Sequence, residues 1–299
     1  MDAGGGAVGT RSELEGCAMR EYYRTATEAE RQFYRQAVYP LQDRVFALMP
    51  VYGELVYLTG GTALSRFYFD HRLSEDIDFF VVTDDLKVLA NDLAARLTAQ
   101  GLEVTIERLD GYFSRFYVMT EPVRLKVEFA REFNLLGDLL PTPAGVLVNN
   151  LEDLGANKIT AFEDRAEIKD IIDLYYITQQ IPWERLFELA DAKRVPVAYE
   201  QLLTINVRGI AGSAWLTTDI AEEKLLGFVT DLTARVEAEV KKKERTALNH
   251  IPAIVTKLLW DFPADRRTLN AYSMPVLRRR LKSLPLPERR ALGGHIGEL

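Results

Sequence analysis

The stretch LTGGTALSRFYFDHRLSEDIDFF, residues 58–80, decides the fold. The apolar run ELVYLTGG (54–61) indicates a short strand that two glycines stop, and ALSRFYFD (63–70) is typical of a helix that opens directly after them. After a loop, DIDFFVV (76–82) alternates and is rich in aromatic and β-branched residues, which favours a second strand. The stretch therefore predicts a strand, a tight turn, a helix and a second strand.

Further elements on both sides of this stretch complete a mixed α/β half. Hydrophobic periodicity predicts helices over about 28–48 and 85–100. Three more strands are expected at EVTIERL (103–109), SRFYVMT (114–120) and VRLKVEFA (123–130). Strict alternation gives the last strand an apolar face, formed by Leu125, Val127 and Phe129, and a polar face, formed by Arg124, Lys126 and Glu128.

From about residue 147 onward, helical periods replace the strand signals. Helices are expected near 150–163, 167–180, 183–192, 219–243 and 248–260. The predicted fold class is therefore α+β, with a small mixed sheet flanked by helices and followed by a mainly α-helical part. The predicted domains are residues 1–146, of which 1–10 are expected to be disordered, and residues 147–299, whose C-terminal part is basic.

The composition argues against several classes of protein. No apolar run approaches the ~20 residues that a membrane-spanning helix needs, and the N-terminus lacks the basic-then-apolar order of a secretory signal. No membrane partner and a cytoplasmic location are therefore expected. Cys17 is the only cysteine and the three histidines are scattered, so neither an intrachain disulfide nor structural zinc is expected.

The net charge of −7 is unevenly distributed along the chain. Residues 241–299 hold 13 Lys and Arg against 5 Asp and Glu, whereas residues 1–240 hold 24 against 39. Basic runs are usually solvated helix faces, but a basic tail on an acidic body also fits an RNA-facing patch. The candidates for RNA contact are Arg278, Arg279 and Arg280.

Paired carboxylates lie on the second strand. Because strand side chains alternate, Asp76 and Asp78 share one face. Like charges this close favour a divalent cation with oxygen ligands, Mg²⁺ or Mn²⁺. Glu128 supplies a third carboxylate if its strand pairs beside this one; otherwise it is an exposed sheet residue paired with Lys126 or Arg124.

The glycine turn supplies the other half of the candidate site. Gly60 and Gly61 permit positive φ and close backbone approach, and the helix after them presents N–H groups and a partial positive charge to a phosphate. Thr62 adds a hydroxyl, and Arg66 on the same helix is a further nucleotide-binding candidate. His71, in the loop that follows, is expected to be solvated rather than catalytic. The sequence thus predicts a triphosphate cradle beside a metal cage.

Lys158 lies in the middle of the apolar stripe of its helix. A lysine there needs an anion, either a nucleotide phosphate or the acids of the next helix, Asp170 and Asp173, unless it snorkels to solvent. Alternatively, Asp170 and Asp173 lie on the helix surface and form ion pairs with Lys169 or Arg165.

Three segments, GGTALSRFYFDHRLSEDIDFF, KVE and NKITAFEDRAEIKDIIDLYY, together resemble the AbiEii/AbiGii-type nucleotidyltransferase toxins, which include the MenT toxins, within the DNA polymerase β-like superfamily. The likeness covers about residues 50–180. It implies a polymerase β-like domain. It also assigns triphosphate and metal ligation to Gly60, Gly61, Thr62, Asp76 and Asp78, and places the later motifs on Lys126, Glu128, Lys158, Arg165, Lys169, Asp170 and Asp173. In these roles Lys158 contacts the nucleotide, and Asp173 orients the nucleotide or the acceptor.

The resemblance implies a Mg²⁺-dependent nucleotidyltransferase of the EC 2.7.7 class. Such an enzyme would move a nucleotide from an NTP onto RNA, with a tRNA 3′ end as the expected acceptor. Translation would then stop unless a cognate antitoxin protein intervened. Two alternatives stay open, namely transfer to a small molecule or a protein, and a non-catalytic nucleotide-binding module.

Overall fold

The computed structural model describes residues 19–165, 167–193 and 210–261. The chain divides into two compact units, Met1–Val236 and Glu237–Leu299. Two predictions fall outside the described residues: disorder over 1–10, and RNA contact through Arg278, Arg279 and Arg280.

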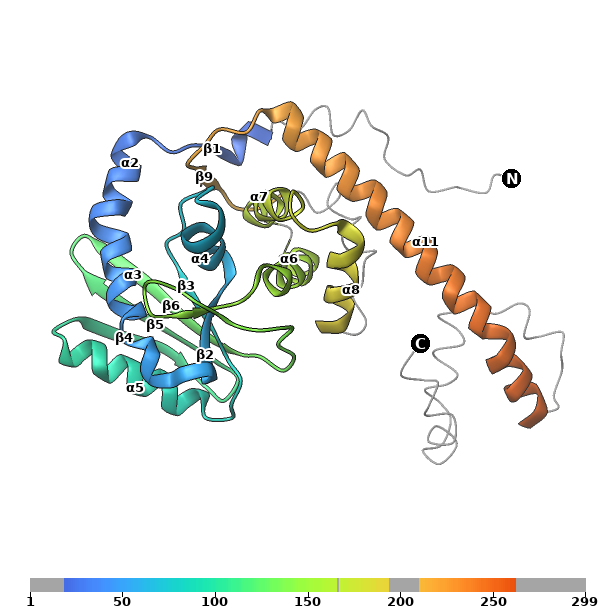
Figure 1. Cartoon of the computed structure of the whole chain (residues 1–299), viewed down its shortest axis with the longest axis horizontal. Coiled ribbons are helices and arrows are strands. Elements are labelled where there is room, and N and C mark those ends of the chain that lie inside the picture. The colour runs from blue at the N-terminus through green and yellow to red at the C-terminus, as the bar shows by residue number, and fades with distance from the viewer. Residues whose placement is uncertain (1–18, 166, 194–209, 262–299) are drawn as a thin grey trace, which may run out of the picture. The chain divides into compact units, whose positions relative to one another are not determined.

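A seven-stranded mixed sheet forms the first unit's framework (Figure 1). Its strands are β2 (Val56–Thr59), β3 (Ile77–Val81), β4 (Glu103–Leu109), β5 (Phe113–Thr120), β6 (Val123–Arg131), β7 (Leu140–Pro141) and β8 (Leu147–Val148). Their order is β4-β5-β6-β3-β2-β8-β7. Because β3 pairs in parallel with β6 and antiparallel with β2, the strand of the paired aspartates lies in the middle of the sheet.

Helices pack on both the long and the short strands of this sheet (Figure 1). The helices between Met19 and Lys193 are, in chain order, η1 (Met19–Glu21), α2 (Glu28–Phe33), η2 (Tyr34–Val38), α3 (Tyr39–Phe46), η3 (Met49–Leu55), α4 (Gly60–Leu64), η4 (Ser65–Phe69), α5 (Leu86–Ala99), α6 (Leu151–Arg165), α7 (Ile168–Ile177) and α8 (Trp183–Lys193). Helix α5 packs on β4, β5 and β6, and α4 packs on β2 and β3. Helix α6 contacts α4, α7 and α8, so these later helices join the sheet through α4.

The alternation predicted for the strands is confirmed and builds the core. Phe129 on β6 is fully buried, and its ring lies 6.0 Å from that of Phe116 and 5.2 Å from that of Phe79. Its neighbours Leu125 and Val127 are also buried. The predicted α+β class, with a mixed sheet flanked by helices, is therefore the observed one.

Some elements differ from the sequence prediction. The helix expected over 63–70 begins earlier, so that both glycines belong to α4. The two helices expected at 219–243 and 248–260 form one continuous helix, α11 (Glu222–Asp261). A second small sheet, in which β1 (Tyr23–Thr25) pairs in parallel with β9 (Ala214–Leu216), was not predicted. No described helix combines the length and the apolarity needed to cross a membrane.

The domain boundary predicted after residue 146 also differs from the compact units. The first unit continues to Val236 because β8 pairs with β2 and because α6 packs on α4. Helices α6, α7 and α8, which the sequence assigned to a separate domain, therefore share one unit with the sheet.

The aromatic cluster around Phe129 should dominate the stability of this sheet. We expect Phe129→Ala to lower the free energy of unfolding by about 3–5 kcal/mol, since it leaves a cavity against Phe79 and Phe116. Urea denaturation followed by circular dichroism measures this. The control is Phe133→Ala, because Phe133 is 73% exposed. An unfolding free energy for Phe129→Ala equal to that of the control would contradict the assignment.

Candidate active site

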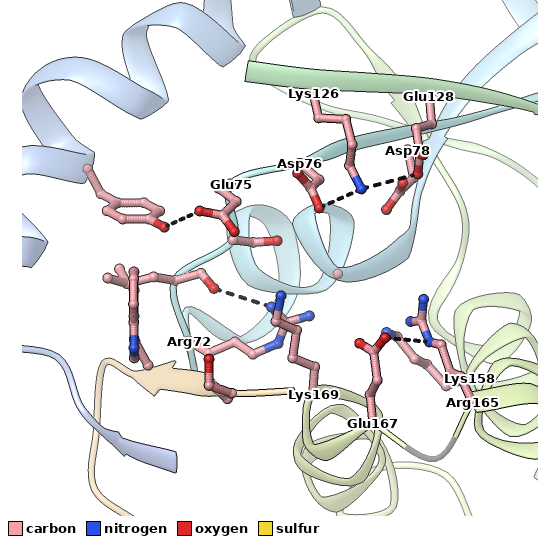
Figure 2. A pocket seen from close by; sticks show the side chains of 17 residues that line it. Arg72, Glu75, Asp76, Asp78, Lys126, Glu128, Lys158, Arg165, Glu167 and Lys169 are labelled. Atoms are coloured by element: carbon pink, nitrogen blue, oxygen red, sulfur yellow. Dashed lines mark hydrogen bonds and ion pairs between the residues drawn. The ribbon is translucent and has the colours of Figure 1, made fainter. Parts of the chain in front are cut away.

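A pocket of about 200 Å³ is lined by residues of α4, β3, β6, α6, α7 and β9 (Figure 2). Figure 2 shows acidic side chains on the side of β3 and β6, namely Asp76, Asp78 and Glu128. It shows cationic side chains on the side of α6, α7 and the loop before β3, namely Lys158, Arg165, Lys169 and Arg72. The pocket therefore places opposite charges across a small space.

The acidic side follows from the strand register. Asp76 directly precedes β3, and Asp78 lies on β3 opposite Glu128 of the parallel strand β6. Ile77 and Phe79 are buried in the core, as the alternation predicted. Burial, together with the neighbouring carboxylates Glu128 and Asp76, raises the pKa of Asp78 to about 6. The three carboxylates that the sequence grouped are thus brought together.

Lys126 provides positive charge within this acidic group. Its Nζ lies 3.0 Å from Oδ2 of Asp76 and 3.5 Å from Oε2 of Glu128. Although burial opposes its charge, the attraction of these carboxylates raises the pKa of Lys126. Arg115 on β5 adds a second cation, with Nε 2.5 Å from Oε1 of Glu128. The sequence left open whether Glu128 forms an ion pair with Lys126. The structure shows this ion pair, and both residues line the pocket.

The donor chemistry of the acidic side fits a divalent cation. Among the residues that the structure describes, no group of three or more His, Cys, Asp or Glu side chains has the arrangement of a metal site. The carboxylates of Asp76, Asp78 and Glu128 are nonetheless hard oxygen donors, and the ammonium of Lys126 bridges two of them as a cation would. Asp78 has no ion-pair partner among the described residues. The Mg²⁺ or Mn²⁺ site therefore stays a prediction, and the oxygen donors of these three residues are of the kind that such a cation prefers.

Both glycines of the turn are required by close neighbours. Gly60 has φ +72°, and a Cβ there would meet the carboxylate of Asp78. A Cβ on Gly61 would meet the guanidinium of Arg72. The turn is therefore the place where an acidic strand and a cationic loop approach the same backbone. Gly61 lines the pocket.

Thr62 and Arg66, both predicted to bind nucleotide, do not line the pocket. The hydroxyl of Thr62 is buried; it donates to the carbonyl of Asp76 and accepts from the Ser74 hydroxyl, with 2.8 Å between the two hydroxyl oxygens. It fixes the turn to the loop that carries the acids. Arg66 lies instead between Asp43 and the Tyr39 ring, with Nη2 2.7 Å from Oδ1 of Asp43. Arg66 projects from its helix toward the α2–α3 segment, so its side chain does not line the pocket.

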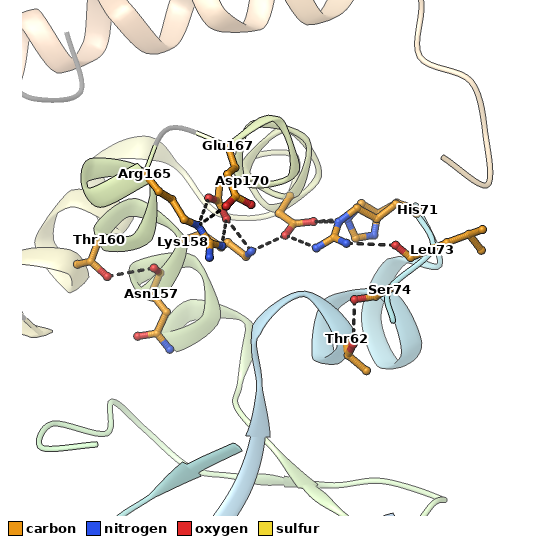
Figure 3. A network of polar contacts seen from close by, with 12 residues as sticks. Thr62, His71, Leu73, Ser74, Asn157, Lys158, Thr160, Arg165, Glu167 and Asp170 are labelled. Carbon is orange, nitrogen blue, oxygen red and sulfur yellow. Dashed lines mark hydrogen bonds and ion pairs between the residues drawn. The ribbon is translucent and has the colours of Figure 1, made fainter. Parts of the chain in front are cut away.

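The cationic side is built around the buried carboxylate of Asp173. Figure 3 shows the surrounding polar network, with His71, Lys158, Arg165 and Asp170 labelled. Arg72 donates to the Asp173 carboxylate through Nε at 2.8 Å and Nη2 at 2.9 Å. Lys158 Nζ lies 2.6 Å from its Oδ2, and His71 Nε2 lies 2.6 Å from its Oδ1. Although burial opposes its charge, Arg72 and Lys158 hold the pKa of Asp173 well below its usual value.

Asp170 extends this group toward the pocket. It is fully buried, and it accepts from Lys158 Nζ at 2.9 Å and from Arg165 at 2.9 and 3.0 Å. The position of Lys158 predicted an anionic partner, either a nucleotide phosphate or the acids of the next helix. The structure shows ion pairs with those acids, Asp170 and Asp173. Asp170 and Asp173 are buried structural partners rather than surface ones, and neither lines the pocket.

The prediction for His71 was wrong. The side chain is buried rather than solvated, because its imidazole forms a buried hydrogen bond with the carboxylate of Asp173, 102 residues further along the chain. Burial lowers the pKa of His71, and Asp173 offsets this only in part. No feature of the loop sequence signals this long-range partner.

Sequence reasoning also missed pocket residues. Arg72 was not singled out, although it lines the pocket and contacts Gly61. Glu75 lines it and accepts from the Tyr34 hydroxyl at 3.3 Å. Trp215 lines it from β9, a three-residue strand too short to show periodicity. The adjacent charges in the loop HRLSE were the one available signal for Arg72 and Glu75.

Comparison with known proteins adds a family match. The family model described as nucleotidyl transferase AbiEii toxin, type IV TA system, matches residues 47–247, two thirds of the chain. The matched region contains every residue that lines the pocket except Tyr34. A search of curated proteins found no match.

Three solved structures that are similar to the chain each have a TM-score below 0.5. JHP933 from Helicobacter pylori is 19% identical, with 76% of this chain and 100% of that chain covered and a TM-score of 0.47. MenT4, a nucleotidyltransferase toxin from Mycobacterium tuberculosis H37Rv, is 19% identical, with 66% and 82% covered and a TM-score of 0.49. The Megavirus polyadenylate synthase is 12% identical, with 74% and 44% covered and a TM-score of 0.32.

The buried network should respond strongly to loss of its central charge. We expect Asp173→Asn to lower the free energy of unfolding by about 3–5 kcal/mol, since Arg72 and Lys158 would stay buried without that carboxylate. Chemical denaturation measures this. In the control Glu152→Gln, which breaks an exposed ion pair with Arg185, the change should stay below about 1 kcal/mol. Equal effects of the two substitutions would contradict the central role of Asp173.

The acidic side should carry an electrostatic cost that depends on pH. Because the folded-state pKa of Asp78 is raised from 3.8 to about 6, its charged form disfavours folding above pH 6, and this cost fades as the pH falls toward 4. In EDTA, Asp78→Asn should therefore raise the melting temperature at pH 7.5, with a gain that shrinks on acidification.

Asp92 provides a control of opposite sign. Arg96 and Tyr52 lower the pKa of Asp92, so its charged form favours folding, and that contribution is lost as the pH falls. Asp92→Asn should lower the melting temperature at pH 7.5. A lower melting temperature for Asp78→Asn at that pH would show that its carboxylate is not electrostatically disfavoured.

Proposed function

Because the chain belongs to the AbiEii family of nucleotidyl transferase toxins of type IV toxin-antitoxin systems, we propose that it transfers a nucleotide from an NTP to RNA. The acceptor we propose is a tRNA 3′ end, whose modification would block translation. Membership of a toxin-antitoxin family implies a cognate antitoxin as a partner. An RNA acceptor and an NTP donor would place this activity in the cytoplasm.

One observation supports the proposal most directly, namely the facing acids and cations of the 200 Å³ pocket. Nucleotidyl transfer is catalysed mainly by positioning and by charge neutralisation, and it needs both signs of charge close together. Cations hold the phosphates, and carboxylates hold metal and handle the acceptor proton. The pocket offers both sets from fixed elements of the fold.

The cationic side is suited to the triphosphate. Arg72 and Lys158 are fixed by Asp173, so their remaining donors are oriented before a substrate arrives. Lys169 lines the same pocket and forms no ion pair with the described residues, which leaves its charge for a phosphate. Gly61 adds close backbone approach. We assign these four residues to the phosphates of the NTP.

The acidic side is suited to metal and to the acceptor hydroxyl. Asp76, Asp78 and Glu128 would hold Mg²⁺ or Mn²⁺. A bound divalent cation would neutralise charge on the reacting phosphate. In this proposal the carboxylate of Asp78 takes the proton of the acceptor hydroxyl. The hydroxyl oxygen then attacks the α-phosphorus, and pyrophosphate leaves toward Arg72 and Lys158.

A labelling assay tests this proposal. Purified protein with Mg²⁺ and each of the four α-labelled NTPs should extend total tRNA, and EDTA should abolish the label. Asp76→Asn should reduce transfer by at least about 100-fold, since it removes a carboxylate of the acidic side. Glu54→Gln, at an exposed acid before β2, should leave transfer unchanged.

The acceptor is distinguished in the same experiment. Transfer to an added small molecule or protein, with none to tRNA, would replace the RNA acceptor by one of those classes. Absence of transfer with all four NTPs and every acceptor would leave a nucleotide-binding module and refute the enzymatic proposal.

A further inference from the structure

We propose that the open face of β5 and β6, beside the acidic side of the pocket, binds the single-stranded 3′ end of the acceptor RNA by stacking its bases on Tyr117 and Phe113. We call this face the stacking ledge and define it by Phe113, Arg115, Tyr117 and Arg124, with Arg108 at its margin. This inference rests on the proposed function, because it names where the acceptor of that reaction lies.

Alternation in β5 creates the ledge. Ser114, Phe116 and Val118 are buried in the core, so the residues between them, Phe113, Arg115 and Tyr117, lie on the opposite face and are half-exposed. Helix α5 packs on these strands. The side chains of the ledge are therefore not used to build the core.

The register of β5 with β6 joins the ledge to the acids. Arg115 is paired with Glu128, and Tyr117 is paired with Lys126. The ion pair of Arg115 with Glu128 shows that both side chains lie on one face. Lys126 contacts Asp76 in turn. Strand β5 therefore lies one strand, about 5 Å, from Glu128 and two strands, about 10 Å, from Asp76 and Asp78. An RNA end lying on Tyr117 would thus have its terminal hydroxyl directed toward the carboxylates.

The ledge alternates aromatic rings and guanidinium planes. Arg124 lies over the ring of Tyr117, with its Cζ 3.8 Å from the centroid. Arg108 and Arg115 lie 5.1 and 5.4 Å from the centroid of Phe113. Aromatic rings and arginine planes are the surfaces on which unpaired bases stack, and open sheet faces of this kind bind single-stranded RNA in several protein modules.

The charges of the ledge suit a phosphate backbone. Arg115 lies 2.5 Å from Glu128 and 3.5 Å from Glu107, so its charge reduces the repulsion that these two acids exert on RNA. Arg124 is exposed and forms no ion pair with any described residue, although it lies one strand from the acids. A cation held over an aromatic ring without an anionic partner is a donor for a phosphate or for a base edge.

Binding of a short fluorescent single-stranded RNA, measured by anisotropy at fixed salt, tests the ledge. We expect Tyr117→Ala and Arg124→Ala each to weaken binding about 10-fold or more, and Tyr117→Phe to retain most of the affinity because the ring remains. The KM for the RNA acceptor should rise in the two alanine variants, while the KM for the NTP stays unchanged.

Tyr112→Ala is the matched control. Tyr112 is likewise an exposed tyrosine under an arginine, Arg131, but by alternation that arginine belongs to the opposite face of β6. This variant should bind RNA as the wild type does. Loss of binding in Tyr112→Ala equal to that in Tyr117→Ala would show a general effect on the sheet and overturn the assignment.

The outcomes separate this inference from the proposed function. RNA transfer by the wild type with unchanged RNA affinity in both alanine variants would overturn the ledge and leave the function intact. Failure of the wild type to bind the oligonucleotide would also overturn it. If Tyr117→Ala left RNA affinity unchanged but blocked labelling of a protein acceptor, the face would belong to a protein partner instead.

Discussion

The buried carboxylate of Asp173 is the contact on which the rest of the site depends. It joins three parts of the chain, because it accepts from Arg72 and His71 in the loop before β3 and from Lys158 on α6. Without it, Arg72 would lose its buried counter-charge and Lys158 would keep only Asp170, which it shares with Arg165. Loss of a buried counter-charge is far costlier than loss of a surface ion pair. Since Arg72 is in turn packed against Gly61, the position of Asp173 also sets the shape of the glycine turn.

The glycine turn connects the two signs of charge in the pocket. Gly60 makes room for the carboxylate of Asp78, and Gly61 makes room for Arg72. The hydroxyl of Thr62, which a phosphate-binding motif would leave for the substrate, is used to hold the loop of Asp76. Gly60, Gly61 and Thr62 are therefore needed for the fold itself, in addition to any contact with a nucleotide. A substitution there would disturb both sides of the pocket at once.

The sequence predicted those features that depend on local pattern. The alternation of β6 placed Glu128 correctly, and the apolar stripe around Lys158 correctly required an anion. The features it missed depend on long-range packing: His71 finds its partner 102 residues away, and Arg66 projects toward α3 although it follows the glycine turn directly. Likewise, β9 has only three residues, so no period could reveal it.

The two sides of the pocket have opposite imbalances of charge. On the cationic side four cations, Arg72, Lys158, Arg165 and Lys169, meet three carboxylates, Asp170, Asp173 and Glu167. On the acidic side four carboxylates, Asp76, Asp78, Glu107 and Glu128, meet two cations, Lys126 and Arg115. Each side is partly neutralised by its own residues. The remaining charge on each side matches what that side would bind, a phosphate on the cationic side and a metal cation on the acidic one. Binding specificity would thus come from small residual charges on rigid supports rather than from a large bare potential.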